Sequence, residues 1–166
     1  MRYMILVRAN AESEAGVMPT EAKMAEMAAY HEELAKAGVL LDASGLQASA
    51  KGWKVRYVGG SRRVVDGPFT EAKEMIAGYT IIQVRSREEA LEWTRRFPNP
   101  TLDDSDCEIE VRRVFELEDF EPNAAVERFR ERLIRRLAEG SLDPAALQQV
   151  ATGRRSELQG LDAAIA

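Results

Sequence analysis

The single histidine of the chain, His31, is the side chain best suited to proton transfer. An imidazole changes its protonation state near neutral pH, as a general acid or base must. Met27 and Leu34 lie four residues before and three residues after His31, which is the spacing of one helical face. We therefore expect His31 to point inward, either as a proton-transfer group in a cleft or as a hydrogen-bonded core residue.

A second group of ionisable side chains lies in the stretch VVDGPFTEAKE, residues 64–74. Asp66 and the Gly-Pro pair after it predict a turn, because Asp accepts backbone N–H groups, Gly adopts positive φ and Pro fixes φ. That turn does not require Lys73 between Glu71 and Glu74. These charges form either an ion-pair network that ties the loop to a strand or a binding site for a small anion.

These residues predict a site for acid–base chemistry on a small, anionic molecule. We expect His31 and Asp66 to be its catalytic residues. Lys73, Arg56 and Glu74 would bind the substrate. Hydrolysis, elimination and isomerisation all fit this set of side chains.

The net charge of −5 argues against nucleic acid as a partner, because no overall positive field attracts phosphates. Arg56, Arg62 and Arg63 lie near Trp53 and Tyr57 and form a local basic and aromatic surface. We interpret this surface as the solvated face of a hairpin.

The composition also argues against metal and membrane partners. One cysteine, Cys107, and one histidine cannot supply the usual zinc ligands, and LDDSD at 102–106 lacks the alternating acidic pattern of a calcium loop. We predict no metal and no cofactor. The apolar runs are short, and Arg8 interrupts the first of them, so we expect a cytoplasmic protein without a membrane segment.

Seven segments would position the site. Their expected order is strand 2–9, helix 20–37, a strand after Gly38, a hairpin around Gly59 and Gly60, strand 78–86, helix 86–97 and strand 107–117. This order is the split βαβ, ferredoxin-like plan with an inserted β-hairpin, so the fold class is α+β.

The first helix should begin at Thr20, a good N-cap residue, and the second at Ser86, which is followed three residues later by Glu89. The apolar positions of the first helix predict its buried face. They are Met24, Met27, Ala28, Leu34 and Ala35.

The composition changes beyond Pro122. Val126, Phe129, Leu133 and Leu137 recur at helical spacing among arginines and glutamates. We therefore divide the chain into a domain at 1–120 and a helical C-terminal extension at 121–166, and expect the extension to brace a dimer or bind a protein partner.

The stretch DGPFTEAKEMIAGYTIIQV, with AGVLLDASGLQ before it and SREEALEWTRRFPNP and EIEVRRVFELEDF after it, resembles the YCII-related proteins and their DGPF-domain subgroup. The resemblance covers roughly residues 1–120. It implies a ferredoxin-like dimeric α/β barrel, a homodimer with a cleft between sheet and helices. It also implies a frequent association with alternative sigma factors.

The wider family includes members with a proposed histidine and aspartate pair. Aligning the two helices puts Met27 at the place of that histidine and Phe97 near the place of that aspartate, so this chain lacks the pair. His31, one helical turn from Met27, is a substitute by geometry alone.

Three functions remain open from the sequence. The chain is an enzyme that uses the cleft, a non-catalytic ligand-binding or regulatory protein that acts with alternative sigma factors, or a structural dimer whose C-terminal helices are the functional surface. We predict a homodimer with a small-molecule ligand and leave its enzyme status open, because this architecture carries unrelated functions.

Overall fold

A computed structural model describes residues 1–70 and 74–138 of the chain. It divides into two compact units, Met1–Val114 and Phe115–Ala166. The first unit contains the two predicted helices, the hairpin and every described strand. The division into domains at residue 120 stays a prediction.

The described part of the first unit contains the seven predicted segments in the predicted order, together with two short helices that were not predicted. Its elements are β1 (Arg2–Arg8), α1 (Ala11–Glu14), α2 (Glu21–Lys36), β2 (Leu40–Gly45), the 3-10 helix η1 (Ser49–Lys51), β3 (Trp53–Val58), β4 (Ser61–Asp66), β5 (Ile76–Gln83), α3 (Arg87–Arg95) and β6 (Ile109–Arg113).

Four of these strands form one sheet in the order β2-β5-β1-β6, and β3 and β4 form a separate two-stranded sheet. All the pairings are antiparallel. The predicted α+β class is therefore confirmed, and the strand order is compatible with the ferredoxin-like plan. The described residues of this single chain form an open sheet and no closed barrel.

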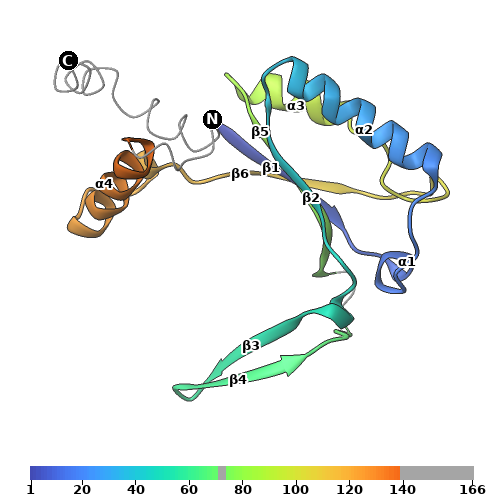
Figure 1. Ribbon diagram of the computed structural model, residues 1–166, viewed down its shortest axis with the longest axis horizontal. Coiled ribbons are helices and arrows are strands. Elements are labelled where there is room, and N and C mark those ends of the chain that lie inside the picture. Colours follow the sequence, from blue (N-terminus) through green and yellow to red (C-terminus); the bar gives the residue numbers. More distant parts are fainter. Residues whose placement is uncertain (71–73, 139–166) are drawn as a thin grey trace. The chain divides into compact units, whose positions relative to one another are not determined.

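Helices α2 and α3 lie on the same face of the four-stranded sheet (Figure 1). Side chains alternate between the two faces of a strand, so every second residue of β1 and β5 points toward the helices. The core consists of Ile5, Tyr30, Leu34, Val39, Ile82, Val84 and Ala90. Tyr3, Met27, Trp93, Phe97 and other half-buried side chains pack against it.

The predicted buried face of α2 was partly wrong. Leu34 and Tyr30 are buried, whereas Met24, Ala28 and Ala35 are exposed. The true inner stripe is Met27, Tyr30, His31 and Leu34, which has the same helical spacing after a small rotation about the helix axis. Alanine occurs on buried and exposed helix faces alike, so counting Ala28 and Ala35 as apolar positions rotated the predicted buried face away from Tyr30.

Both predicted helix starts are confirmed. The Thr20 hydroxyl accepts a hydrogen bond from the Lys23 N–H at 3.3 Å, and the Ser86 hydroxyl accepts one from the Glu89 N–H at 3.2 Å. Each cap satisfies one of the N–H groups that the first turn of a helix leaves without a partner.

The predicted hairpin is also confirmed. Strands β3 and β4 pair from Trp53↔Asp66 to Val58↔Ser61, and Gly59 and Gly60 make the turn with φ of +56° and +77°. A two-residue turn with positive φ at both positions matches the twist of the strands, and glycine adopts it without steric cost.

The second unit contains the 3-10 helix η3 (Leu117–Asp119) and α4 (Ala124–Ala138). The Asn123 side chain accepts hydrogen bonds from the backbone N–H groups of Ala125 and Val126 at 2.9 and 3.1 Å and so caps α4. The rest of the predicted helical extension, residues 139–166, lies outside the described residues. Within the part that is described, no helix is long and apolar enough to cross a membrane.

Candidate functional site

His31 reaches from α2 to β5, where its Nε2 lies 2.9 Å from Thr80 Oγ1. Thr80 is only 2% exposed because it faces the helices on the same side of β5 as Ile82. The His31 ring itself is half-buried. The helix and the sheet thus hold a titratable ring at a fixed position at the margin of the core.

Burial lowers the pKa of His31 below its ordinary value, and a hydrogen bond from the ring to the backbone of Met27 opposes that shift. A ring nitrogen that bonds to a helix carbonyl must be the donor. In the tautomer whose other nitrogen is the donor, Nε2 is the acceptor of the neutral imidazole and the Thr80 hydroxyl donates to it; in the other tautomer Nε2 donates to Thr80 Oγ1. The arrangement favours a neutral base.

The DGPF segment packs against Ser49, a buried residue of η1. The Ser49 N–H donates to both carboxylate oxygens of Glu14 at 3.2 Å, and its hydroxyl also donates to Glu14. The Phe69 N–H donates to Ser49 Oγ at 3.0 Å. We call this network of Glu14, Ser49 and Phe69 the Ser49 clasp.

Gly67 fits into the Ser49 clasp because it lacks a side chain. A Cβ on Gly67 would lie 1.9 Å from the backbone oxygen of Ser49. The Gly67 N–H donates to the Gly52 carbonyl at 3.0 Å, and Lys54 Nζ lies 4.2 Å from the centroid of the Phe69 ring. Gly67 and Phe69 of the motif therefore join the hairpin to η1, and through Ser49 to α1, which explains these two residues structurally.

The predicted site residues lie on separate elements. Asp66 is exposed at the end of β4, and Arg56 is exposed in β3 opposite Arg63. Glu74 is exposed just before β5, and Lys73 lies outside the described residues. No hydrogen bond or ion pair joins these side chains to His31 in residues 1–70 and 74–138.

Sequence reasoning missed two polar residues of this region. Alternation in GYTIIQV places Thr80 on the buried face with Ile82, so a usable signal was present. The contact between Ser49 and Glu14 joins residues 35 positions apart, so no local sequence pattern predicts it.

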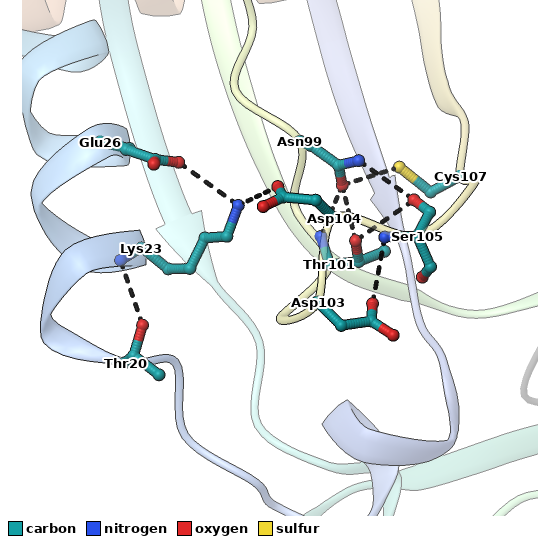
Figure 2. Close-up of polar contacts among 9 residues, drawn as sticks. All are labelled: Thr20, Lys23, Glu26, Asn99, Thr101, Asp103, Asp104, Ser105 and Cys107. Carbon is teal, nitrogen blue, oxygen red and sulfur yellow. Dashed lines mark hydrogen bonds and ion pairs between the residues drawn. The ribbon is translucent and has the colours of Figure 1, made fainter.

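The loop after α3 is held by its own polar groups and by α2 (Figure 2). Asn99 Oδ1 accepts hydrogen bonds from the Thr101 N–H at 2.9 Å and the Thr101 hydroxyl at 2.7 Å. The Cys107 thiol lies 3.2 Å from the same oxygen. Lys23 pairs with Asp104 and, at 3.4 Å, with Glu26.

In the loop at 102–106 the Lys23 ammonium pairs with Asp104 and neutralises its charge. A hydrogen bond from Ser105 lowers the pKa of Asp103. Across the described ranges, no group of three His, Cys, Asp or Glu side chains is placed to hold a metal ion.

An open pocket with a volume of about 300 Å³ lies between α2 and the end of α3. Its lining residues are Glu26, Ala29, Tyr30, Glu33, Arg96 and Pro98. Arg96 pairs with Glu33 and stacks 4.6 Å from the centroid of the Trp93 ring. The Tyr30 hydroxyl donates to the Trp93 carbonyl at 3.0 Å, and burial raises the pKa of Tyr30 to about 12.

In that pocket Arg96 pairs with Glu33, Glu26 pairs with Lys23, which is not a lining residue, and Tyr30 stays protonated at neutral pH. None of the predicted site residues lines it. The pocket is explained as packing between α2 and the loop after α3.

The family model of the YCII-related domain matches residues 1–118, more than two thirds of the chain. The chain belongs to the YCII-related family. The matched range includes α2, the hairpin and β5, so His31, Thr80 and the Ser49 clasp all lie inside the YCII-related domain.

Known proteins that are similar to the chain include a bacterial relative and a solved enzyme structure. An uncharacterized protein of Rhizobium meliloti (strain 1021) is 32% identical over 79 residues, which are 48% of this chain and 64% of that protein. The solved structure of 5-chloro-2-hydroxyhydroquinone dehydrochlorinase from Burkholderia phenoliruptrix AC1100, in complex with 2,5-dihydroxybenzoquinone, is 15% identical. It covers 73% of this chain and 100% of its own, with a TM-score of 0.39.

Proposed function

We propose that this YCII-related domain, of the DGPF subgroup, binds a small anionic organic molecule beside His31 and transfers a proton there. The observation that carries the proposal is the 2.9 Å contact between His31 Nε2 and the Thr80 hydroxyl on a half-buried ring. A general base must be neutral, fixed in orientation and reachable, and these are the properties that the contact supports.

The chemistry follows from the tautomer. With Met27 accepting from one ring nitrogen, the Thr80 hydroxyl must rotate away from Nε2, which then takes up a proton from a bound substrate and returns it to the product. An anion beside the ring would stabilise the imidazolium that forms in between, because an opposite charge favours the charged state.

The anionic group of the substrate requires a cation. In this proposal Lys73, Arg56 and Glu74 bind the substrate, and Asp66 acts as a second proton acceptor. The exposure of Asp66, Arg56 and Glu74 supports these roles, because each side chain is accessible to a ligand.

Isothermal titration calorimetry with small mono- and dicarboxylic acids tests the proposal. We expect at least one acid to bind the wild-type chain and to bind His31→Gln at least about tenfold more weakly, because a lost charge-assisted contact costs about 1.4 kcal/mol or more. A compound that binds is then incubated with the protein and followed by NMR for turnover. Equal affinity for both proteins, or no binding by any acid, contradicts the proposal.

We also propose that the chain works as a homodimer through the face of the four-stranded sheet that is opposite α2 and α3. Alternation along β1 and β5 places Met4, Leu6, Tyr79 and Ile81 on that face, and all four are half-exposed. A second copy of the sheet would cover them in the way that the resemblance implies.

Sedimentation velocity tests this dimer. Leu6→Lys places a charge at the centre of the face and should weaken the dimer while the chain stays folded, whereas Glu92→Lys on the opposite, helical side of the unit should leave the dimer intact. A wild-type chain that sediments as a monomer at every concentration overturns the dimer.

A further inference from the structure

The β3–β4 hairpin exposes more apolar surface than a solvated loop requires. Trp53 is 66% exposed, Tyr57 73% and Val64 63%. A two-stranded hairpin is at best marginally stable in water, and neither strand pairs with the four-stranded sheet. Contiguous exposed apolar surface of this kind marks an interaction site.

Four of the five exposed large apolar side chains of the hairpin lie on one face, and Val58 lies on the other. The pairing puts Trp53 opposite Asp66, Val55 opposite Val64 and Tyr57 opposite Arg62. Directly paired residues of an antiparallel ladder point to the same side, so Trp53, Val55, Tyr57 and Val64 form one row, which we call the hairpin strip. Arg62 lies 5.5 Å from the centroid of the Tyr57 ring at one end of this row.

The other face of the hairpin is basic. It carries Lys54, Arg56 and Arg63. Four basic side chains and one acidic one give residues 53–66 a net charge of +3, which leaves −8 on the rest of a chain whose total is −5. The hairpin is thus a positively charged element of an acidic protein, and its electrostatic complement is present in every other copy of the chain.

The base of the hairpin is fixed. The Ser49 clasp and the bond from the Gly67 N–H to the Gly52 carbonyl hold the end of β4 and the start of β3. A fixed base lowers the entropy that the hairpin would lose on docking, as a pre-organised binding element requires.

We infer that the hairpin strip packs against a second copy of this chain. The two valines at the centre of the strip fit apolar side chains of a protein, whereas single-stranded nucleic acid favours successive aromatic platforms. The hairpin is basic and the rest of the chain is acidic, so a second copy of the chain offers the opposite charge to the hairpin. We therefore take a second copy as the binding partner of the hairpin strip. This contact is separate from the sheet-face dimer and does not depend on the proton-transfer site.

Photo-crosslinking of the purified full chain tests the contact. Tyr57→p-benzoylphenylalanine places a photo-reactive group in the hairpin strip, and Glu92→p-benzoylphenylalanine places the same group on the exposed side of α3 as a control. We expect irradiation to give a covalent product of twice the chain mass from the Tyr57 variant and at least about fivefold less from the control.

The test separates the contact from the other proposals. A chain that sediments as a dimer but gives no interchain product at Tyr57 overturns the hairpin contact and leaves the sheet-face dimer intact. A product that forms only with an added single-stranded oligonucleotide overturns the second copy as occupant and makes nucleic acid the partner.

A pair of adjacent substitutions gives the matching affinity test. Tyr57 and Val58 are similarly exposed, 73% and 69%, but alternate to opposite faces of β3. Tyr57→Ser should weaken self-association at least about tenfold, as the loss of an aromatic anchor does, and Val58→Ser should change it less than about threefold. Circular dichroism checks that both variants fold, and equal effects of the two substitutions contradict the inference.

Discussion

The contact between His31 and Thr80 combines two roles in one side chain. The Thr80 hydroxyl and the Met27 backbone satisfy the imidazole, as they would in a core histidine. The same two bonds also fix the tautomer and orientation that a general base needs. Because the ring is half-exposed, a ligand can reach it as a general base would require. The pH titration of His31 distinguishes this role from that of a core histidine.

The pH dependence of stability should report His31. Its folded-state pKa is lowered, so it contributes stability above its unfolded pKa of about 6.5, and that stability is lost as pH falls through the folded pKa. We expect the free energy of unfolding to fall more steeply between about pH 7 and pH 5 in the wild type than in His31→Gln. Urea denaturation measures this difference, and parallel pH profiles would contradict the burial of the ring.

Thr80→Val should raise the pKa of His31. The substitution removes a hydrogen bond that favours the neutral ring, and it should cost about 1 kcal/mol of stability because Nε2 loses its donor. Thr80→Ser keeps the hydroxyl and is the matched control. NMR of the ring resonance against pH gives the pKa of His31 in each variant. An identical pKa in Thr80→Val and Thr80→Ser would rule out the Thr80 bond.

At the residue scale, the sequence predicted the inward direction of His31 but not its partner. Helical spacing places His31 with Met27 and Leu34, and strand alternation places Thr80 inside. Their meeting depends on how far α2 lies along the sheet, and local patterns do not contain that distance.

Among the elements, the DGPF segment acts through packing. Its glycine approaches the Ser49 backbone, and its phenylalanine N–H bonds to the Ser49 hydroxyl. A change of chain direction at Asp66, Gly67 and Pro68 was predictable from the sequence. The positive φ predicted for Gly67 was wrong, because glycine is required there by the approach to the Ser49 backbone, and that buried serine was not predictable.

Gly67→Ala should disrupt the Ser49 clasp. The new Cβ would lie 1.9 Å from the Ser49 carbonyl oxygen, and backbone must move to admit it, so we expect a loss of about 1–3 kcal/mol or more. Gly52→Ala is the matched control, because its Cβ would be 3.7 Å from the same oxygen. Thermal unfolding compares the two variants. Equal stability would show that the Ser49 clasp admits the new Cβ without a loss of folding free energy.

The order of helices and strands was predictable because caps, glycine turns and alternation are local signals. Thr20 and Ser86 start their helices, and Gly59 and Gly60 turn the hairpin as expected. The buried face of α2 was less predictable, since its alanines carry little directional information and Tyr30 can lie inside or outside.

For the whole molecule, two surfaces compete to explain self-association. The open sheet face carries half-exposed side chains such as Leu6 and Ile81, and the hairpin strip carries Trp53 and Tyr57. If both proposals hold, Leu6→Lys and Tyr57→Ser should each weaken the dimer, and their effects should add because the sites share no contact. Sedimentation equilibrium of the two single variants and the double variant measures this, and a double variant no weaker than Leu6→Lys alone would assign the dimer to the sheet.

The most direct test of proton transfer uses the fact that the chain has one histidine, so its ring proton resonance needs no assignment. The resonance is followed against pH in the ligand-free protein and with the tightest-binding carboxylic acid. We predict a His31 pKa below about 6.5 without ligand, because the ring is half-buried. With the acid bound we predict a higher His31 pKa, because an anion favours the imidazolium. A ligand that binds but leaves this pKa unchanged would contradict a proton-transfer site at His31.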